Sequence, residues 1–287
     1  MSEDELPRAV AIMDPADFEQ LYSLFNDCNW LKRSSAGVLA LWNKCQTQGE
    51  RDLINDLIRR FYVADSNLQN DMATSIAKVI ERRWNLSADD SIIVAISDDG
   101  DADGSQAFLQ IIKNKFDPDD NWTGRSFVNS VPEGLKRLNG KNNMVLLDDF
   151  IGTGETMISR YRSLENRLAA MGMAHVKMYV TAAAGMENAR DRLLDEKIDT
   201  YCPVWLKKGI SGNYSGVELP NNIAHMKRLE QDLAKTIKRA PLQSFGYQQS
   251  ESLFCMQDWN VPDNVFPIFW WPKYIDKSRR PVIFRRI

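Results

Sequence analysis

The chain has 287 residues, of which 44% are hydrophobic, and it carries a formal net charge of −3. This length allows one large hydrophobic core or two smaller ones, and the weak negative charge disfavours direct binding to nucleic acids. No apolar run is long enough to span a membrane and the first residues lack the pattern of a signal peptide, so we expect a cytoplasmic protein without membrane contact.

Cysteine and histidine are too few and too scattered to indicate a zinc site or a disulfide framework. The four cysteines include no C-x-x-C pair, so we expect free and mostly buried thiols. The scarcity of histidine also argues against Ser-His-Asp and Cys-His hydrolases. These residues are Cys28, Cys45, Cys202, Cys255, His175 and His225.

Residues 1–88 are predicted to be helical. Apolar residues recur there at intervals of three and four, and no glycine occurs between Gly49 and Gly100. Such stripes are typical of helices that pack on a core, although the region could also form a hood over a site or a docking surface for a partner. The clearest stripes consist of Leu53, Ile54, Leu57, Ile58 and Phe61, and of Leu68, Met72, Ile76, Ile80 and Trp84.

Strands and helices are predicted to alternate over residues 89–220. An apolar run at 92–96 predicts a buried strand, and an acidic loop and an amphipathic helix follow it. A second strand is expected at 126–131, and the polar, basic stretch 132–143 is typical of a mobile loop. Because further strand–helix units follow, we predict an α/β core with a mostly parallel sheet flanked by helices.

The most informative motif begins with the apolar run 144–147, which is typical of an inner parallel strand. Asp148 and Asp149 would emerge at the carboxyl end of this strand, where open α/β sheets bind ligands. Two adjacent carboxylates there could accept hydrogen bonds from the vicinal hydroxyls of a ribose and lie close to a bound Mg²⁺.

The turn that follows has the composition of a phosphate-binding loop. Gly152 and Gly154 let the backbone bend and approach a ligand, while Thr153 and Thr156 add hydroxyl donors beside the N–H groups of the next helix. A phosphate in this loop and a diol at the carboxylates together predict a ribose 5-phosphate ligand.

Residues 221–287 are predicted to form a helix to about Lys238 and then an aromatic-rich extension packed on the core. In this extension, Asn260 and Asn264 bracket a proline next to aromatic rings. Most of these rings are expected to pack in the core, but the segment could also bind a base through stacking and amide hydrogen bonds.

The motif at 144–156 resembles the 5-phosphoribosyl-1-pyrophosphate signature of type I phosphoribosyltransferases, and the order of elements over about residues 90–210 is similar to that family. The resemblance implies that Asp148 and Asp149 bind the ribose, act in catalysis and hold Mg²⁺. Gly152 stands where threonine is common, which should matter little because backbone N–H groups hold most of the phosphate. The phosphoribosyl-binding residues would be Asp148, Asp149, Ile151, Gly152, Thr153, Gly154, Glu155 and Thr156.

The resemblance also implies a pyrophosphate-contacting loop after the early strand, and here the chain departs from the family. The loop is acidic although Arg or Lys would be expected, so it would have to hold pyrophosphate through Mg²⁺. Alternatively, Asp103 or Ser105 caps a helix, or the loop resembles an EF-hand whose twelfth position is Gln110 instead of Glu. The loop residues are Asp98, Asp99, Gly100, Asp101, Asp103, Gly104 and Ser105.

In this family a basic residue of the mobile loop usually assists the leaving group. Lys136 and Arg137 are therefore predicted to be catalytic, with Arg125 and Lys141 as further candidates, although each could instead be a solvated surface charge. Lys207 and Lys208 could approach a phosphate or face water.

The combination of helical N-terminus, acidic loop, Asp-Asp signature and closing aromatic motif resembles a branch of phosphoribosyltransferase-like proteins found with bacterial conflict systems, including retron and other anti-phage loci. This resemblance implies an enzyme that transfers or hydrolyses a group at the anomeric carbon of a phosphoribosyl compound or nucleotide, restrained by a protein partner. Two alternatives stay open: an inactive sensor or regulatory subunit with the same ligand, and a structural subunit of a nucleoprotein defence complex.

Overall fold

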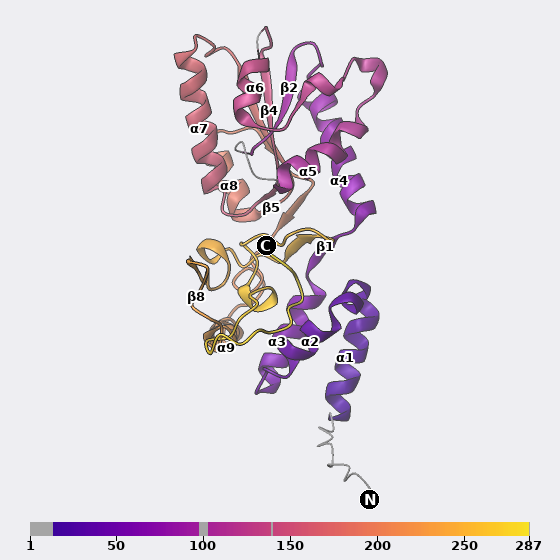
Figure 1. Cartoon of the computed structure of the whole chain (residues 1–287), viewed down its shortest axis with the longest axis vertical. Helices are drawn as coiled ribbons and strands as arrows, with labels where there is room; N and C mark the ends of the chain where they lie inside the picture. The colour runs from indigo at the N-terminus through magenta and orange to yellow at the C-terminus, as the bar shows by residue number, and fades with distance from the viewer. Residues whose placement is uncertain (1–13, 98–102, 139, 287) are drawn as a thin grey trace, which may run out of the picture.

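The computed structural model describes residues 14–97, 103–138 and 140–286, which form two parts stacked along the long axis (Figure 1). Each part has its own cluster of buried apolar side chains. One cluster belongs to a sheet with its helices, and the other combines N-terminal helices with the C-terminal segment. Among the described residues, no helix is both long and apolar enough to cross a membrane.

A parallel sheet of six strands forms the centre of the first part, in the portion of the chain that the structure describes. Its order is β3-β2-β4-β5-β6, and β7 pairs with the last residues of β5. Its inner strands are almost fully buried, as expected for a parallel sheet flanked by helices, and the predicted α/β class is confirmed. The strands are β2 (Ser91–Ala95), β3 (Phe127–Val128), β4 (Asn143–Ile151), β5 (Lys177–Met186), β6 (Thr200–Tyr201) and β7 (Val204–Leu206).

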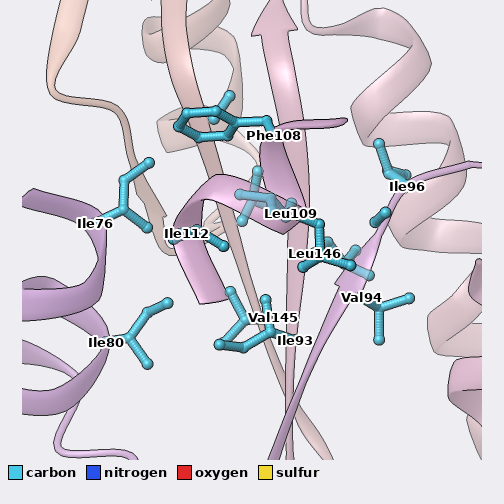
Figure 2. Packing of buried hydrophobic residues seen from close by; sticks show 14 of the residues in the cluster. Ile76, Ile80, Ile93, Val94, Ile96, Phe108, Leu109, Ile112, Val145 and Leu146 are labelled. Atoms are coloured by element: carbon cyan, nitrogen blue, oxygen red, sulfur yellow. The ribbon is translucent and has the colours of Figure 1, made fainter. Parts of the chain in front are cut away.

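Helices α4 and α5 pack on each other and on the sheet (Figure 2). Phe108, Leu109 and Ile112 of α5 pack in one cluster with Ile76 of α4 and Ile80 of the π-helical turn after it, and all five side chains are at most 1% exposed. Burying each of them contributes about 1.5–3 kcal/mol, which fixes the start of α5 beside the carboxyl ends of the strands. The helices of this part are α4 (Ser66–Lys78), which continues as a π-helical turn (Val79–Arg83), α5 (Gly104–Ile112), α6 (Val131–Arg137), α7 (Glu155–Ala170) and α8 (Glu187–Asp195).

The second part joins the beginning and the end of the chain. Thr47 and Glu50 form a capping box at the start of α3, because each accepts a hydrogen bond from the other's backbone N–H. The buried Glu50 carboxylate also pairs with Arg228 of α9, which ties the two ends together. The elements are α1 (Pro15–Asp27), α2 (Ser35–Trp42), α3 (Gln48–Arg59), α9 (Glu218–Gln231), β8 (Thr236–Ile237), β9 (Ala240–Pro241) and β10 (Phe254–Met256).

A short strand that the sequence reading missed lies between the two parts. This strand, β1 (Tyr62–Ala64), pairs in parallel with β10. The predicted domain boundaries at residues 88 and 220 stay a prediction, but the buried side chains show how the segments group. Helix α4 packs with the sheet, whereas most of the C-terminal segment packs on the N-terminal helices.

Two local predictions are wrong. The stretch 132–143, predicted to be a mobile loop, contains helix α6, because Pro132 suits the first turn of a helix and Val131 and Leu135 bury an apolar face. The helix predicted to reach Lys238 ends at Gln231, and the chain then forms the antiparallel pair β8 and β9. The prediction for the cysteines is confirmed, since all four are buried and free.

Candidate active site at the carboxyl edge of the sheet

The two signature carboxylates lie near the end of β4. The strand continues to Ile151, so Asp148 and Asp149 are its sixth and seventh residues instead of following it. Asp148 pairs with Ala182 of β5, and its Oδ1 accepts a hydrogen bond of 2.9 Å from the Asp149 N–H. Both side chains are half-buried, at the edge where ligands bind in open α/β sheets.

These carboxylates lie in an environment that disfavours their negative charge. Burial raises the pKa of Asp148 well above its usual range, and the charge of Asp149 raises it further. Burial also raises the pKa of Asp149, and the Asp103 carboxylate acts in the same direction on both groups. Neither carboxylate forms an ion pair with another described residue, so a cation bound here would relieve their repulsion.

The start of α5 packs directly on this pair. Asp103 is the N-cap of the helix: its carboxylate accepts hydrogen bonds from the Gln106 N–H at 3.1 Å and from the Ser105 hydroxyl at 2.6 Å. A Cβ built on Gly104 would overlap the Asp149 carboxylate, so only glycine lets the helix approach this closely. The residues Asp98, Asp99, Gly100 and Asp101 of the predicted pyrophosphate loop lie outside the described residues.

The capping alternative for Asp103 is thus confirmed, and the EF-hand alternative does not fit the structure. In the EF-hand register, residues 104–110 would form the second half of a calcium loop. They are instead part of the continuous helix α5, which extends to Ile112. Among the described residues, no group of three or more His, Cys, Asp or Glu side chains could hold a metal ion.

The glycine-threonine turn after β4 leads directly into α7. Gly154 occupies the N-cap position with a left-handed φ of 77° and provides no capping side chain. The Glu155 N–H donates a hydrogen bond of 3.5 Å to the Thr153 hydroxyl, and the next N–H groups of α7 remain for a ligand. Thr153 is buried, and its carbonyl accepts a hydrogen bond of 2.9 Å from Arg192 Nη1 of α8. The Arg192 side chain therefore stabilises the turn from α8. The sequence did not predict this contact.

Six of the eight predicted phosphoribosyl-binding residues line one cavity of about 230 Å³, whereas Asp149 and Glu155 are outside this lining. This volume is below the roughly 300–1,000 Å³ typical of small-molecule pockets, so it suits a compact ligand. Three residues of the C-terminal segment complete its lining. The lining residues are Asp148, Phe150, Ile151, Gly152, Thr153, Gly154, Thr156, Met157, Tyr247, Asp263 and Asn264.

The C-terminal residues contact the turn closely. A Cβ built on Gly152 would overlap the side-chain amide of Asn264, and the Gln248 amide donates a hydrogen bond to the Glu155 carboxylate. Of the two asparagines singled out in the sequence, Asn264 lines the cavity, whereas Asn260 is exposed and outside the lining. Tyr247 and Asp263 carried no sequence signal of their own, because their position depends on how the chain folds back.

The structure does not bring Lys136 and Arg137 to the carboxylates. Both pair with Glu133 on α6, at 3.5 Å and 2.8 Å respectively. The turn after α6 is hydrogen-bonded to residues 88–90, which precede β2, so this end of α6 lies at the amino edge of the sheet. The cavity lies at the opposite, carboxyl edge.

The other basic candidates differ in position. Lys141 donates to the Ala88 carbonyl at the amino edge, and Arg125 is exposed in a 3₁₀ turn before β3. Lys207 and Lys208 directly follow β7, which pairs with the end of β5, so they lie at the carboxyl edge. That edge also holds Arg160 of α7, which donates a hydrogen bond to the Ile96 carbonyl.

Comparison with known families gives a match over most of the chain. The model of the PRTase-CE family matches residues 38–286, which extend from α2 through both parts of the molecule. The chain belongs to the PRTase-CE family. Membership supports a phosphoribosyltransferase-like protein of the transferase type with a phosphoribosyl-type ligand. No curated protein matches the chain.

Proposed function

We propose that this PRTase-CE protein is an enzyme that binds a 5-phosphoribosyl substrate with Mg²⁺ and transfers or hydrolyses a group at the anomeric carbon of the ribose. The observation that carries the proposal is the single cavity shared by Asp148, the turn 152–154 and Thr156. The Asp148 carboxylate, with Asp149 next to it in the chain, and the start of α7 are chemical counterparts for the diol and the phosphate of one sugar phosphate.

Each group of the substrate has a chemical counterpart in the cavity. The open N–H groups at the start of α7 and the hydroxyls of Thr153 and Thr156 would donate to the 5-phosphate. The Asp148 and Asp149 carboxylates would accept hydrogen bonds from the ribose hydroxyls. Arg192 stabilises the turn through the Thr153 carbonyl and adds positive charge close to the bound phosphate.

The carboxylate pair also fits Mg²⁺. This ion is usually held by one or two carboxylates together with water and substrate phosphates, so a third protein ligand is not required. Burial raises the pKa values of both Asp148 and Asp149, and nearby carboxylates, Asp149 and Asp103 for Asp148 and Asp103 for Asp149, raise them further, which a divalent cation would offset. When bound, the ion would neutralise charge on the phosphate groups of the substrate.

The reaction itself requires little covalent chemistry from the protein. The bond between the anomeric carbon and its leaving group breaks, and an acceptor nitrogen or a water oxygen forms the new bond. Positive charge develops on the sugar during this step, and the Asp148 and Asp149 carboxylates would stabilise it. The acidic loop 98–105 would contact the leaving pyrophosphate through the metal ion.

A basic residue that would assist the leaving group is the part of the proposed site with the least structural support. The proposed catalytic role of Lys136 and Arg137 would require the end of α6 to move from the amino edge of the sheet. The described residues that line the cavity include no lysine or arginine. This observation favours one alternative function, a sensor or regulatory subunit that binds phosphoribosyl pyrophosphate or a nucleotide without turnover.

The proposed setting is anti-phage defence, with activity restrained by a protein partner or within a nucleoprotein complex, as the resemblance to conflict-system proteins implies. A purely structural role in such a complex is the remaining alternative. It differs from the other two in one testable respect, since it leaves the carboxylate pair without a ligand.

The proposal is tested by calorimetric titration of phosphoribosyl pyrophosphate with and without Mg²⁺. We expect Mg²⁺-dependent binding that is lost in the Asp148→Asn/Asp149→Asn double variant. The matched control is Asp119→Asn/Asp120→Asn, which neutralises an adjacent pair of exposed carboxylates elsewhere on the molecule. Absence of binding to the folded wild type would contradict the proposal. Product formation then separates the enzyme from the sensor.

A further inference from the structure

The wall of the cavity opposite the phosphate turn comes from a segment about 100 residues later in the chain. Tyr247, Asp263 and Asn264 line the same cavity as Asp148, and the amide of Asn264 lies against Gly152. Because Gly152 directly precedes the phosphate-binding Thr153, this wall is in contact with the part of the site that would hold the substrate.

The backbone that carries this wall is held in an unusual conformation. Between residues 245 and 251, five residues have left-handed φ values of 51° to 80°, and four of them are not glycine. Strained backbone of this kind persists only when the surrounding structure holds it, and it gathers at binding and catalytic sites. The five residues are Phe245, Gly246, Gln248, Gln249 and Glu251.

Two buried carboxylates hold the strained segment. Glu251 accepts hydrogen bonds from the N–H groups of Ile210 and Ser211 at 2.8 Å and 2.7 Å, and from the Ser211 hydroxyl at 2.6 Å. Glu230 of α9 accepts hydrogen bonds from the Ser244 hydroxyl and the Phe245 N–H. The wall is therefore a fixed surface anchored on the second part of the molecule.

Asn264 is also held by hydrogen bonds. Its backbone carbonyl accepts hydrogen bonds from the Ser250 hydroxyl at 2.8 Å and the Ser252 N–H at 3.0 Å. Its Nδ2 donates to Ser250 Oγ at 3.3 Å, which leaves the amide oxygen and the second amide hydrogen available. Asn264 is 9% exposed, so its amide is largely shielded from water.

The neighbouring lining residues add complementary chemistry. Tyr247 is half-buried and offers an aromatic ring for stacking. Asp263 is half-buried, and its ion pair with Arg286 involves Oδ2, at 3.3 Å, so Oδ1 can accept a further hydrogen bond. A planar heterocycle with an amino group beside a ring nitrogen matches the donor and acceptor pattern of this wall, since an asparagine amide pairs with such an edge in two hydrogen bonds.

We propose that Asn264, Asp263 and Tyr247 form the specificity-determining wall of the site and select an amino-bearing, adenine-type base at the anomeric carbon. The amide of Asn264 binds the edge formed by the amino group and ring nitrogen, the Asp263 carboxylate accepts from the amino group, and Tyr247 stacks on the ring. This inference rests on the proposed function, because the base is placed by the sugar phosphate.

The test compares three ligands by calorimetry with Mg²⁺ present: ribose 5-phosphate, adenosine 5′-monophosphate and inosine 5′-monophosphate. We expect the adenine nucleotide to bind the wild type on the order of tenfold more tightly than the other two ligands, the scale of one good amide–base pair. Asn264→Ala should remove this preference, so that adenosine 5′-monophosphate and inosine 5′-monophosphate bind this variant with affinities within about threefold of each other.

Two further variants keep the test informative. Asp263→Asn replaces an acceptor at nearly constant size and should also reduce the preference for the amino base even if Asn264→Ala fails to fold. The matched control is Asn260→Ala, an exposed asparagine outside the lining, which should leave the preference unchanged. Equal binding of all three ligands to the wild type would overturn the inference and keep the proposed function, whereas no binding of any of them would overturn both.

Discussion

The two walls of the cavity differ in how the chain builds them. The phosphate wall is one continuous stretch, residues 148–156, in which a strand, a turn and a helix start follow each other. The opposite wall consists of Tyr247, Asp263 and Asn264, which reach the cavity only because the C-terminal segment folds on the N-terminal helices and pairs through β1 and β10. A local wall depends on backbone geometry, whereas the distant wall depends on long-range packing.

The contact between the two walls offers the strongest test of this difference. In Gly152→Ala the added Cβ would overlap the Asn264 amide, so the turn and the C-terminal wall would have to separate. Overpacking of this kind costs about 1–3 kcal/mol, and we expect ribose 5-phosphate affinity to fall by up to roughly 100-fold. Calorimetry and thermal unfolding would measure the two effects.

The control for this substitution is Gly124→Ala. No atom lies within 4 Å of the Cβ that would be added there, and the backbone is not left-handed. This variant should behave like the wild type. Unchanged affinity in Gly152→Ala would show that the two walls are not in contact in solution.

The stability of the distant wall should also depend on pH through Glu230, whose carboxylate accepts a hydrogen bond from the Phe245 N–H. Burial raises the pKa of Glu230 from 4.5 to about 7 in the folded protein. Because the folded state then binds the proton more tightly than the unfolded state, this group favours folding below about pH 4.5, and its contribution is lost as the pH rises to about 7. This difference in pKa corresponds to about 3 kcal/mol of the free energy of unfolding.

Urea unfolding between pH 5 and pH 8 measures this dependence. Glu230→Gln removes the titration but keeps an oxygen that can accept from Ser244 and Phe245, so the variant should show a flatter stability profile. Other groups contribute equally to both proteins, and the difference between the two profiles isolates Glu230. Parallel profiles would show that Glu230 is not buried as the structure has it.

The same contrast explains what could be predicted from the sequence. The order strand, Asp148, Asp149, glycine-threonine turn and helix is local, so spacing and composition were enough to predict these elements, while their binding of a phosphate stays a prediction. The prediction of a loop at 132–143 was wrong because the structure of this stretch depends on tertiary packing. It contains most of α6 and returns the chain to the amino edge, so Lys136 and Arg137 lie away from the cavity, and their catalytic role stays a prediction.

One residue in the sequence, Gly152, is consistent with the presence of the distant wall. Gly152 occupies a position where the resemblance implies threonine, and the structure gives the departure a reason, since the Asn264 amide fills the space of a side chain. The strained residues 245–251 could not be foreseen, because non-glycine residues adopt a left-handed φ only when distant contacts hold them.

A smaller loss of phosphate affinity is expected from a substitution in α8, which contacts the phosphate turn through Arg192. Arg192→Ala removes the hydrogen bond to the Thr153 carbonyl, which is worth about 0.5–1.5 kcal/mol, so phosphate affinity should fall by roughly three- to tenfold. Arg190→Ala is a matched control on the same helix, because Arg190 pairs with its exposed neighbour Asp191. Equal losses in both variants would point to general charge and argue against a specific hold on the turn.

The smallest effect is expected at the other edge of the sheet. In Lys136→Ala/Arg137→Ala only surface pairs with Glu133 are lost, and such pairs contribute at most about 1 kcal/mol. If α6 keeps its position during the reaction, ligand affinity and turnover should change by less than about twofold. A much larger loss of turnover at unchanged ligand affinity would show that the end of α6 moves to the carboxyl edge. In that case the site depends on long-range rearrangement on both sides of the phosphate turn, and only the turn itself is local.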